Sequence, residues 1–384
     1  RGFDVLNGSE NEEFPAFGDY RLLSAQLDLH LYWCREAREP RISYLQSRFP
    51  CELYGADRVG TDKYRPSSRL RMNAAAACMG FGVHTYRDGL PEEVSCIVEG
   101  GGDVEFDLDE HHAGDEGGYG WLGLPVEEPR RIDVAGEELL TVDAAGWELA
   151  QEGHDADAET SAVEHTFGDD APTSAREADV TGLSPVSDPA AGLGGWTGHR
   201  LRRMWAARLL SPPVGPTVES GEEVVLTMWL DADPQNDDIE GERYAAFPRE
   251  VGFRLEQGDA LGPMQTVLAG PKPRRLDLTL TAPATGHPRL AVGVGCELGP
   301  VWVGGVRLRR GCAEVLARRF EAGAILMNGS QSAAWEFDLP ALFPDMELRR
   351  IRGSQSPQVN TGEALGGSLR LGPLDGAFLR AEGP

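Results

Sequence analysis

The chain has 384 residues, which is enough for two or three domains that each have their own core. It carries 62 acidic and 36 basic residues, for a formal net charge of -26. This charge argues against a nucleic-acid partner, because the protein would repel the phosphate backbone. No stretch approaches the roughly 18 consecutive apolar residues that a membrane-spanning helix needs.

The first predicted elements are a strand, an acidic loop and a helix. The run Phe3–Leu6 is short and largely apolar and is followed by an Asn-Gly turn, as is typical of a strand. A cluster of glutamates follows, and we expect it to form a loop. From about Asp19, leucines recur at helical spacing, which predicts a helix with Asp19 as its cap.

The same alternation is then repeated. Residues 41–46 predict a second strand, 47–65 a long polar loop, 66–78 a helix with proline in its first turn, and 81–86 a third strand. Strands that alternate with helices at this spacing indicate parallel βαβ units.

The composition changes near residue 150. Residues 150–195 are rich in Asp, Glu, Ala, Gly, Ser and Pro, as expected of a linker. Short strand-like runs with Gly and Pro between them then predict a β-sandwich. These runs are 204–210, 223–230, 250–255, 275–280, 289–294 and 301–308. Further strand-like runs at 324–328, 335–339, 348–351 and 367–379 predict a small terminal sheet packed on the first domain.

Several of these segments resemble parts of one family. The run "DLHLYWCREAREPRISYLQSRFPCELYGADRVGTDKYRPSSRLRMNAAAACMGFGVHTYRDG" and the later "GYGWLGLPVEEP" are similar to the closing strands of a (β/α)8 barrel in bacterial glycoside hydrolases. The segments "RRFEAGAILMNGS" and "LGPLDGAFL" resemble the terminal β-domain of those proteins. The segment "VWVGGVRLRRG" resembles the last strand of a carbohydrate-binding jelly roll.

The resemblance implies an α/β plus all-β architecture in three parts. Residues 1–148 would be the C-terminal part of a (β/α)8 (TIM) barrel, 149–312 a β-sandwich (jelly-roll) module, and 313–384 a C-terminal β-domain packed on the barrel. A full barrel needs about 250 residues, so we expect the chain to begin within one. The alternative is a smaller, complete α/β layer.

Barrel enzymes place their reacting groups at the carboxyl ends of strands, and glycoside hydrolysis usually needs two carboxyl groups. The catalytic candidates are therefore Glu10, Glu12 and Glu13. In one related clan the second acid would stand where this chain has Gln46, which cannot act as a nucleophile. In another clan the partner would lie upstream of this sequence. The simpler alternative is a solvated acidic loop.

The predicted substrate-binding residues lie at the strand ends and in the loops that follow. They are Asn7, Gln46, Arg48, Tyr54, Asp57, Arg58, Tyr86, Asp88, Asp109, Glu110 and His111. We expect the segment from Asp109 to His112 to be either a loop on the substrate side or a plain exposed loop. Its adjacent histidines lack the i, i+4 spacing of a helical metal site, and the six cysteines form no CxxC pair, so we expect no metal.

Two functions remain open at this stage. The first is a glycoside hydrolase fragment that acts on a polysaccharide or oligosaccharide by carboxylate acid/base chemistry. The second is a non-catalytic carbohydrate-binding or structural protein with a degenerate barrel. No strand is followed by G-x-G-x-x-G or a P-loop, so we expect no nucleotide cofactor. Carbohydrate is the expected partner in both cases, and an extracytoplasmic location is favoured.

Aromatic rings that stack on sugars are a further candidate feature. The predicted sandwich contains four tryptophans, namely Trp196, Trp205, Trp229 and Trp302. Each is as compatible with the sandwich interior as with a ligand-binding face, and the sequence leaves this choice open.

Overall fold

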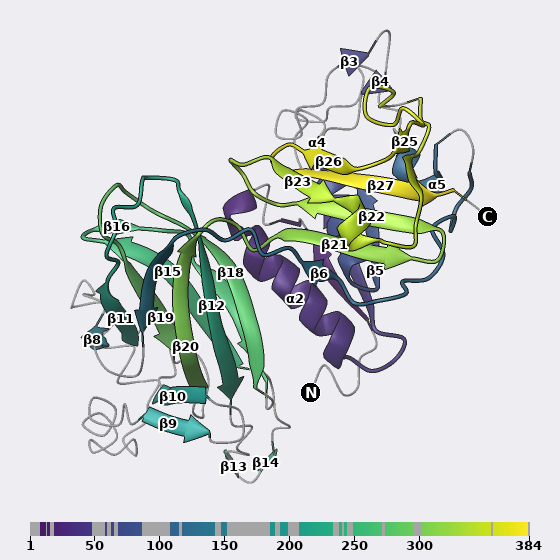
Figure 1. Ribbon diagram of the computed structural model, residues 1–384. Helices are drawn as coiled ribbons and strands as arrows, with labels where there is room; N and C mark the ends of the chain where they lie inside the picture. Colours follow the sequence, from purple (N-terminus) through teal and green to yellow (C-terminus); the bar gives the residue numbers. More distant parts are fainter. Residues whose placement is uncertain are drawn as a thin grey trace. The chain divides into compact units, whose positions relative to one another are not determined.

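The computed structural model is mostly β with few helices, and it divides into two compact units (Figure 1). The sandwich unit comprises Arg1–Gly2 and Ala135–Cys312, and the mixed unit comprises Phe3–Val134 and Ala313–Pro384. The structure describes residues 8–12, 14–15, 19–47, 58–59, 63–64, 68–86, 108–114, 117–142, 147–151, 185–188, 193–198, 207–232, 238–239, 242–243, 249–270, 273–294, 301–354 and 356–382.

The sandwich unit contains two six-stranded antiparallel sheets. The first has the order β18-β12-β20-β10-β9, with β7 also paired to β20, and the second has the order β16-β15-β19-β11-β8, with β17 also paired to β15. The strands of the first sheet are β7 (Glu138–Val142), β9 (Pro185–Asp188), β10 (Leu193–Gly198), β12 (Glu223–Ala232), β18 (Arg274–Thr281) and β20 (Val301–Arg310). Those of the second are β8 (Glu148–Gln151), β11 (Ala207–Pro213), β15 (Arg249–Gln257), β16 (Ala260–Leu261), β17 (Gln265–Ala269) and β19 (Arg289–Val294). A separate short ribbon pairs β13 (Asp238–Ile239) with β14 (Glu242–Arg243).

Alternating apolar residues explain why these strands pack into a sandwich. In β12, Leu226, Met228 and Leu230 are buried, and the residues between them point to the other face of the sheet. Strand β15 of the second sheet packs against β18 of the first, and β17 packs against β12. The predicted β-sandwich is therefore confirmed. It also includes β7 and β8, which begin before the predicted boundary at residue 149.

The mixed unit contains a three-stranded parallel sheet with the order β1-β2-β5. Its strands are β1 (Gly8–Glu12), β2 (Ile42–Ser47) and β5 (Gly82–Tyr86). The helices are α2 (Leu23–Glu36), preceded by the short 3-10 helix η2 (Tyr20–Leu22), then α4 (Ser68–Met79) and α5 (Asp109–His112). The carboxylate of Asp19 caps η2 by accepting a hydrogen bond from the backbone of Arg21. The predicted second and third strands and the two long helices are confirmed, whereas the predicted first strand, 3–6, lies outside the described residues. A short pair, β3 (Arg58–Val59) and β4 (Lys63–Tyr64), lies between β2 and α4 in the sequence.

A six-stranded antiparallel sheet completes the mixed unit, with the order β25-β24-β27-β22-β21-β6. Its strands are β6 (Arg130–Arg131), β21 (Val315–Phe320), β22 (Gly323–Asn328), β24 (Leu348–Arg350), β25 (Ala364–Leu365) and β27 (Asp375–Ala381). Beside it lie the ribbon of β23 (Trp335–Asp338) and β26 (Ser368–Leu371) and the short helix α8 (Leu339–Leu342). Strand β6 pairs with β21, so this sheet joins segments that are distant in the sequence.

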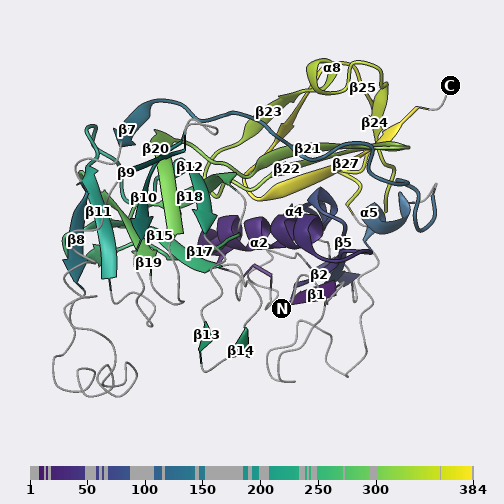
Figure 2. The same cartoon turned by 90° about the horizontal axis from the view of Figure 1, so that it is seen from below.

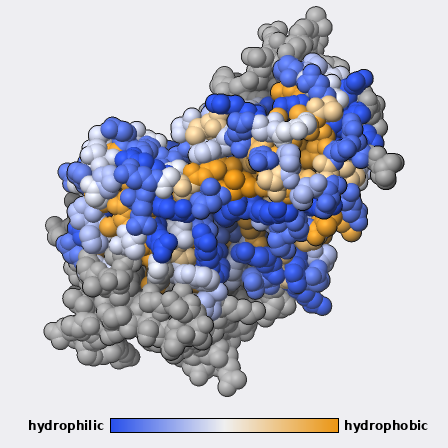
Figure 3. All heavy atoms as spheres, in the orientation of Figure 1, coloured by the Kyte–Doolittle hydropathy of each residue, from blue (hydrophilic) through white to orange (hydrophobic). Residues whose placement is uncertain are grey.

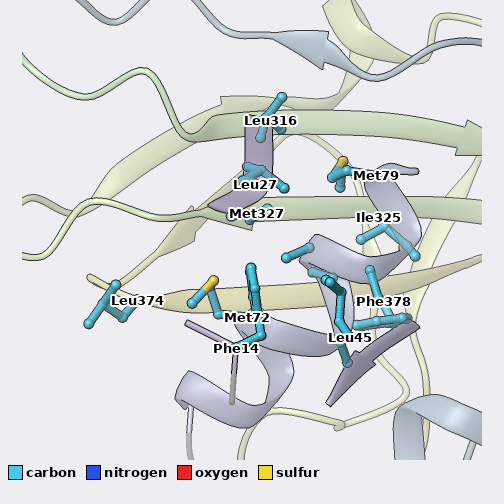
Figure 4. Packing of buried hydrophobic residues seen from close by; sticks show 14 of the residues in the cluster. Phe14, Leu27, Leu45, Met72, Met79, Leu316, Ile325, Met327, Leu374 and Phe378 are labelled. Carbon is cyan, nitrogen blue, oxygen red and sulfur yellow. The ribbon is translucent and has the colours of Figure 1, made fainter. Parts of the chain in front are cut away.

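Helix α4 lies between the two sheets of the mixed unit (Figure 2). It packs on β22 and β27 on one side and on β2 and β5 on the other. A helix covered on two sides has little room for a polar face, and the run Ala74–Ala77 is almost completely buried. Met72 of α4 belongs to the same core, and Leu27 of α2 and Leu45, Ile325 and Phe378 of the two sheets extend it (Figure 4). In the space-filling view hydrophilic residues are spread over both units and apolar ones form smaller patches (Figure 3).

A fully buried histidine joins α2 to the parallel sheet and to α4. His30 Nε2 lies 3.1 Å from the carbonyl oxygen of Ala77, and its Nδ1 lies 2.8 Å from Ser43 Oγ. Since a carbonyl can only accept, Nε2 carries the proton and Nδ1 accepts from the serine hydroxyl. A Cβ on Gly80 would lie 2.6 Å from His30 Nε2, so no side chain fits there. Burial lowers the pKa of His30 from 6.5 to about 4.

This pKa predicts an acid-dependent loss of stability. Because the folded protein resists protonation of His30 while the unfolded chain does not, the contribution is complete above about pH 6.5 and is lost as the pH falls toward 4. The expected loss is about 3 kcal/mol in the free energy of unfolding. Urea denaturation from pH 4 to 7 measures it. In His30→Gln the free energy of unfolding should fall by less between pH 7 and pH 4 than in the wild type. The exposed control His287→Gln should show the full wild-type loss. An equal acid sensitivity in both variants would contradict the assignment to His30.

Candidate functional site

Two of the three glutamates proposed as catalytic groups lie in a strand. Glu10 and Glu12 belong to β1, which pairs in parallel with β2, so the prediction that they form a loop is wrong. Backbone pairing with β2 holds these polar residues extended although none of them is a strong strand former. In the register, Glu10 lies opposite Tyr44 and Glu12 opposite Gln46.

The two faces of the parallel sheet have different surroundings. Ser43 and Ser47 bond to His30 of α2 and Asn73 of α4, respectively, so their face is covered by the helices. Tyr44 and Gln46 alternate with them and therefore belong to the opposite face. Glu10 lies opposite Tyr44 and is exposed to solvent.

Gln46 is almost fully buried. Its Oε1 has no hydrogen-bond partner among the residues that the structure describes. An amide at this place supplies no carboxyl group for acid/base catalysis.

Several predicted site residues lie outside the described residues. These are Asn7, Glu13, Arg48, Tyr54, Asp57 and Asp88. For three others the structure describes only the place in the backbone: Glu12 is the last residue of β1, Arg58 is in β3, and Tyr86 is the last residue of β5.

The acidic segment that was predicted to be a substrate-side or exposed loop is a short buried helix, α5. Asp109 accepts hydrogen bonds from the backbone of Ser354 at 3.2 Å, from the backbone of Ser356 at 3.1 Å and from Asn360 Nδ2 at 3.2 Å. A Cβ on Gly353 would collide with the same carboxylate. Asp109 therefore anchors residues 353–354 and 356–360, and the prediction of an exposed loop is wrong.

Glu110 is also buried, with 2% of its surface exposed. Its Oε1 accepts a hydrogen bond of 2.9 Å from Asn360 Nδ2, and its Oε2 has no partner among the described residues. Burial raises the pKa of Glu110, although the hydrogen bond from Asn360 and the charge of Arg71 oppose the shift. The neighbouring His111 is half-buried. Among the described residues, no three His, Cys, Asp or Glu side chains gather as metal ligands do.

The mixed unit also contains a buried ion pair, and its arginine opposes the burial-driven rise in the pKa of Glu110. Arg71 of α4 lies 2.8 Å from Asp375 at the start of β27, and both side chains are largely buried. Burial raises the pKa of Asp375, and Arg71 opposes this shift. The ion pair thus joins α4 to β27, while the carboxylates of α5 bond to Ser354, Ser356 and Asn360.

A different set of side chains faces solvent on the first sheet of the sandwich unit. Trp229 of β12 is 38% exposed, whereas Met228 and Leu230 on either side of it are buried. In the sheet register Trp229 lies directly opposite Arg275 of β18, and Thr227 lies opposite both Asp277 of β18 and Arg307 of β20. Opposite residues in an antiparallel sheet project from the same face. We call the set Thr227, Trp229, Arg275, Asp277 and Arg307 the Trp229 face.

The polar groups of the Trp229 face are ordered around one carboxylate. Asp277 accepts a hydrogen bond of 2.6 Å from Thr227 Oγ1 and one of 3.1 Å from Arg275 Nη2. The backbone next to the ring is a glycine bulge: the register of β12 and β20 shifts between Thr227 and Trp229, and Gly305 has a φ of 61°. A Cβ at Gly305 would lie 3.4 Å from Trp229 Cδ1, so the indole edge stays uncrowded. The face therefore offers an open aromatic ring beside fixed hydrogen-bonding groups.

The alternation around Trp229 is the signal that could have identified it. Leu226, Met228 and Leu230 form one row of the strand, which leaves Trp229 in the other row. Trp196 and Trp302 lie in β10 and β20, where only their backbone places are described, and Trp205 lies outside the described residues.

Comparisons with known proteins give fold-level likenesses only. No family model matches the chain, and no curated protein matches it. The structure titled "BiXyn10A CBM1 APO" is 9% identical, covers 46% of this chain and 100% of its own, and has a TM-score of 0.29. TmCBM61 in complex with beta-1,4-galactotriose is 9% identical over 44% of this chain and 91% of its own, with a TM-score of 0.25. A carbohydrate-binding module of Cellvibrio mixtus lichenase 5A in complex with cellotriose is 11% identical over 34% of this chain and 88% of its own, with a TM-score of 0.24. At TM-scores below 0.5 these likenesses carry no argument about function.

Within the part of the chain that the structure describes, none of the helices combines the length and the apolar character needed to cross a membrane.

The burial of Glu110 predicts a stability change with pH. Because its pKa is higher in the folded protein than in the unfolded chain, its contribution is complete below about pH 4.5 and is lost as the pH rises through the raised value. Within that window the free energy of unfolding falls by at most about 1.4 kcal/mol per pH unit. Glu110→Gln should remove this term. The difference in urea stability between variant and wild type at each pH measures it, with the exposed Glu128→Gln as control. A difference that does not change with pH would contradict the prediction.

Proposed function

We propose that this protein binds carbohydrate through the Trp229 face. The observation that carries the proposal is a tryptophan held outward on a paired strand beside groups that donate and accept hydrogen bonds. An indole face can pack on the apolar C–H surface of a sugar ring, while polar side chains around it bond to the hydroxyl groups.

The energetics of the strand support a binding role. Leaving apolar surface in water costs about 25 cal/mol per Å², so an exposed indole is a cost unless something covers it. A central strand with neighbours on both sides is a rigid support for the ring, because β12 pairs with β18 and with β20. Binding to such a preformed surface loses little conformational entropy.

The mixed unit supports a binding function without catalysis, because its buried polar groups have structural uses. The buried pair Asp109 and Glu110 has a structural use, and Gln46 occupies a strand end where an acid would be needed. The function then resides in the sandwich, and the α/β part serves as a scaffold.

The proposal predicts that Trp229→Ala weakens polysaccharide binding at least about tenfold, which is about 1.4 kcal/mol, because the stacking surface is lost. Native affinity electrophoresis against a panel of soluble neutral and acidic polysaccharides would identify the ligands, and isothermal titration would give the affinities. The exposed apolar Leu261 on the second sheet offers a matched control, Leu261→Ala, which should bind as wild type does. If no polysaccharide retards the protein, or if the Trp229→Ala variant is retarded as strongly as the wild type, the proposal is refuted.

A second candidate is glycoside hydrolysis, with residues 1–148 as the closing part of a (β/α)8 barrel, a jelly-roll module after it and the C-terminal β-domain packed on the barrel. The observation that favours it is the exposed carboxylate of Glu10 on the sheet face that the helices do not cover. A carboxyl group there is free to act as a general acid or base on a glycosidic bond.

Hydrolysis predicts the release of reducing ends from at least one bound polysaccharide. Glu10→Gln should then lower the rate by about 100-fold or more, as the loss of a general acid or base does, and Glu12→Gln and Glu13→Gln identify any partner. Glu36→Gln, an exposed change on α2, should leave the rate unchanged. Binding without any release of reducing ends would eliminate this candidate and leave the binding proposal intact.

A further inference from the structure

We infer that the carbohydrate bound at the Trp229 face is an anionic polysaccharide, one whose sugars carry carboxylate or sulfate groups. This inference rests on the proposed binding function and specifies its ligand class. It depends on the charges around Trp229, which differ from those of the chain as a whole.

The exposed charges of the Trp229 face are cationic. The side chain of Arg275 is 55% exposed, whereas that of Asp277 is 14% exposed and already accepts two hydrogen bonds. Arg307 is exposed and has no ion-pair or hydrogen-bond partner among the described residues. Two guanidinium groups therefore reach solvent on this face, and the one carboxylate among them is engaged.

This arrangement is unusual for a chain with 62 acidic and 36 basic residues. Three other arginines of the sandwich unit form ion pairs with carboxylates. Arg254 pairs with Glu256 at 2.8 Å, Arg289 with Glu148 at 2.7 Å, and Arg310 with Glu137 and Glu222. Arg307, which no described carboxylate pairs with, therefore has capacity beside an open tryptophan for an anion from outside.

The positions of the two arginines suit a charged sugar. Arg275 lies directly opposite Trp229 on one neighbouring strand, and Arg307 lies opposite Thr227 on the other. Directly opposite side chains are about 5 Å apart and diagonal ones about 7–8 Å apart, so both guanidinium groups can reach a ring stacked on the indole. A guanidinium binds carboxylate or sulfate oxygens through two parallel hydrogen bonds, which a neutral hydroxyl cannot match.

The net charge of the chain does not prevent this binding. At physiological ionic strength charges more than about 8 Å apart are largely screened, so the groups in contact with the ligand decide the affinity. A duplex nucleic acid carries one charge per about 1.7 Å of its length. A polysaccharide with one charge per sugar brings fewer charges against the acidic surface.

The test compares charged polysaccharides with their neutral counterparts. Polygalacturonate is titrated beside its fully methyl-esterified form, and chondroitin sulfate beside its desulfated, carboxyl-reduced form, all in 0.15 M salt. We expect at least one anionic member to bind about tenfold more tightly than its neutral counterpart. Arg307→Gln should remove most of that preference and leave the affinity for the neutral form, and Trp229→Ala should weaken both. Because Arg307 has no hydrogen-bond or ion-pair partner among the described residues, its replacement removes no such bond to them.

The control removes one exposed arginine elsewhere. Arg370→Gln, on β26 of the mixed unit, should keep the preference, which separates a local effect from a change in net charge.

Each other outcome has a definite meaning. Equal affinity for charged and neutral forms, with both lost in Trp229→Ala, overturns this inference and leaves the binding proposal standing. No binding of any polysaccharide overturns both. A preference for anionic forms that survives in Arg307→Gln and Arg275→Gln overturns the assignment to this face. Tighter binding of single-stranded RNA than of every polysaccharide overturns the ligand class.

Discussion

The mixed unit depends on the close packing of helix α4 between two sheets. Alanine has no atoms beyond Cβ, so the run Ala74–Ala77 lets strands approach the helix from both sides. Strands come equally close on the two sides: a Cβ on Gly376 of β27 would lie 2.6 Å from the carbonyl oxygen of Arg71, and one on Gly82 of β5 would lie 2.6 Å from that of Ala77. The contact at Gly376 brings Asp375, the residue before that glycine, within reach of the Arg71 guanidinium. The packing of small residues thus determines where the buried ion pair forms.

Buried acidic residues of the mixed unit are engaged in bonds within the fold. A charge removed from water must be paired or hydrogen-bonded. Asp375 satisfies Arg71, and Asn360 and two backbone amides satisfy Asp109. Glu110 receives one hydrogen bond and is left with a raised pKa. These groups hold residues 353–354 and 356–360 against α5, so their chemistry is structural, although an acidic stretch beside two histidines looks like a site.

Helices and strands with a clear hydrophobic periodicity can be predicted from the sequence. Elements that depend on pairing with residues far along the chain cannot. Local patterns predict helix α2, an Asp19 cap, which the structure places on the preceding 3-10 helix η2, the second and third parallel strands and the main sandwich strands. They do not predict the strand β1, because Gly8–Glu12 lacks strand-forming residues and is extended by its pairing with β2. The burial of Asp109 is also beyond local patterns, since its partner Ser354 is 245 residues away. The alternation in β12 shows that Trp229 lies on the face opposite Met228 and Leu230. It does not show which of the two faces is buried, because both carry large side chains.

The two units use polar groups in opposite ways, and this difference supports the proposal that binding occurs on the sandwich unit. In the mixed unit buried charges are consumed by internal bonds. In the sandwich unit aliphatic rows fill the interior, so polar and aromatic side chains of β12, β18 and β20 project outward. On the Trp229 face, Asp277 bonds to Thr227 and Arg275, whereas Trp229 keeps an exposed ring and Arg307 keeps hydrogen-bonding capacity that no described residue uses. Recognition requires such unused capacity on a rigid support, and a sheet whose interior is apolar supplies both.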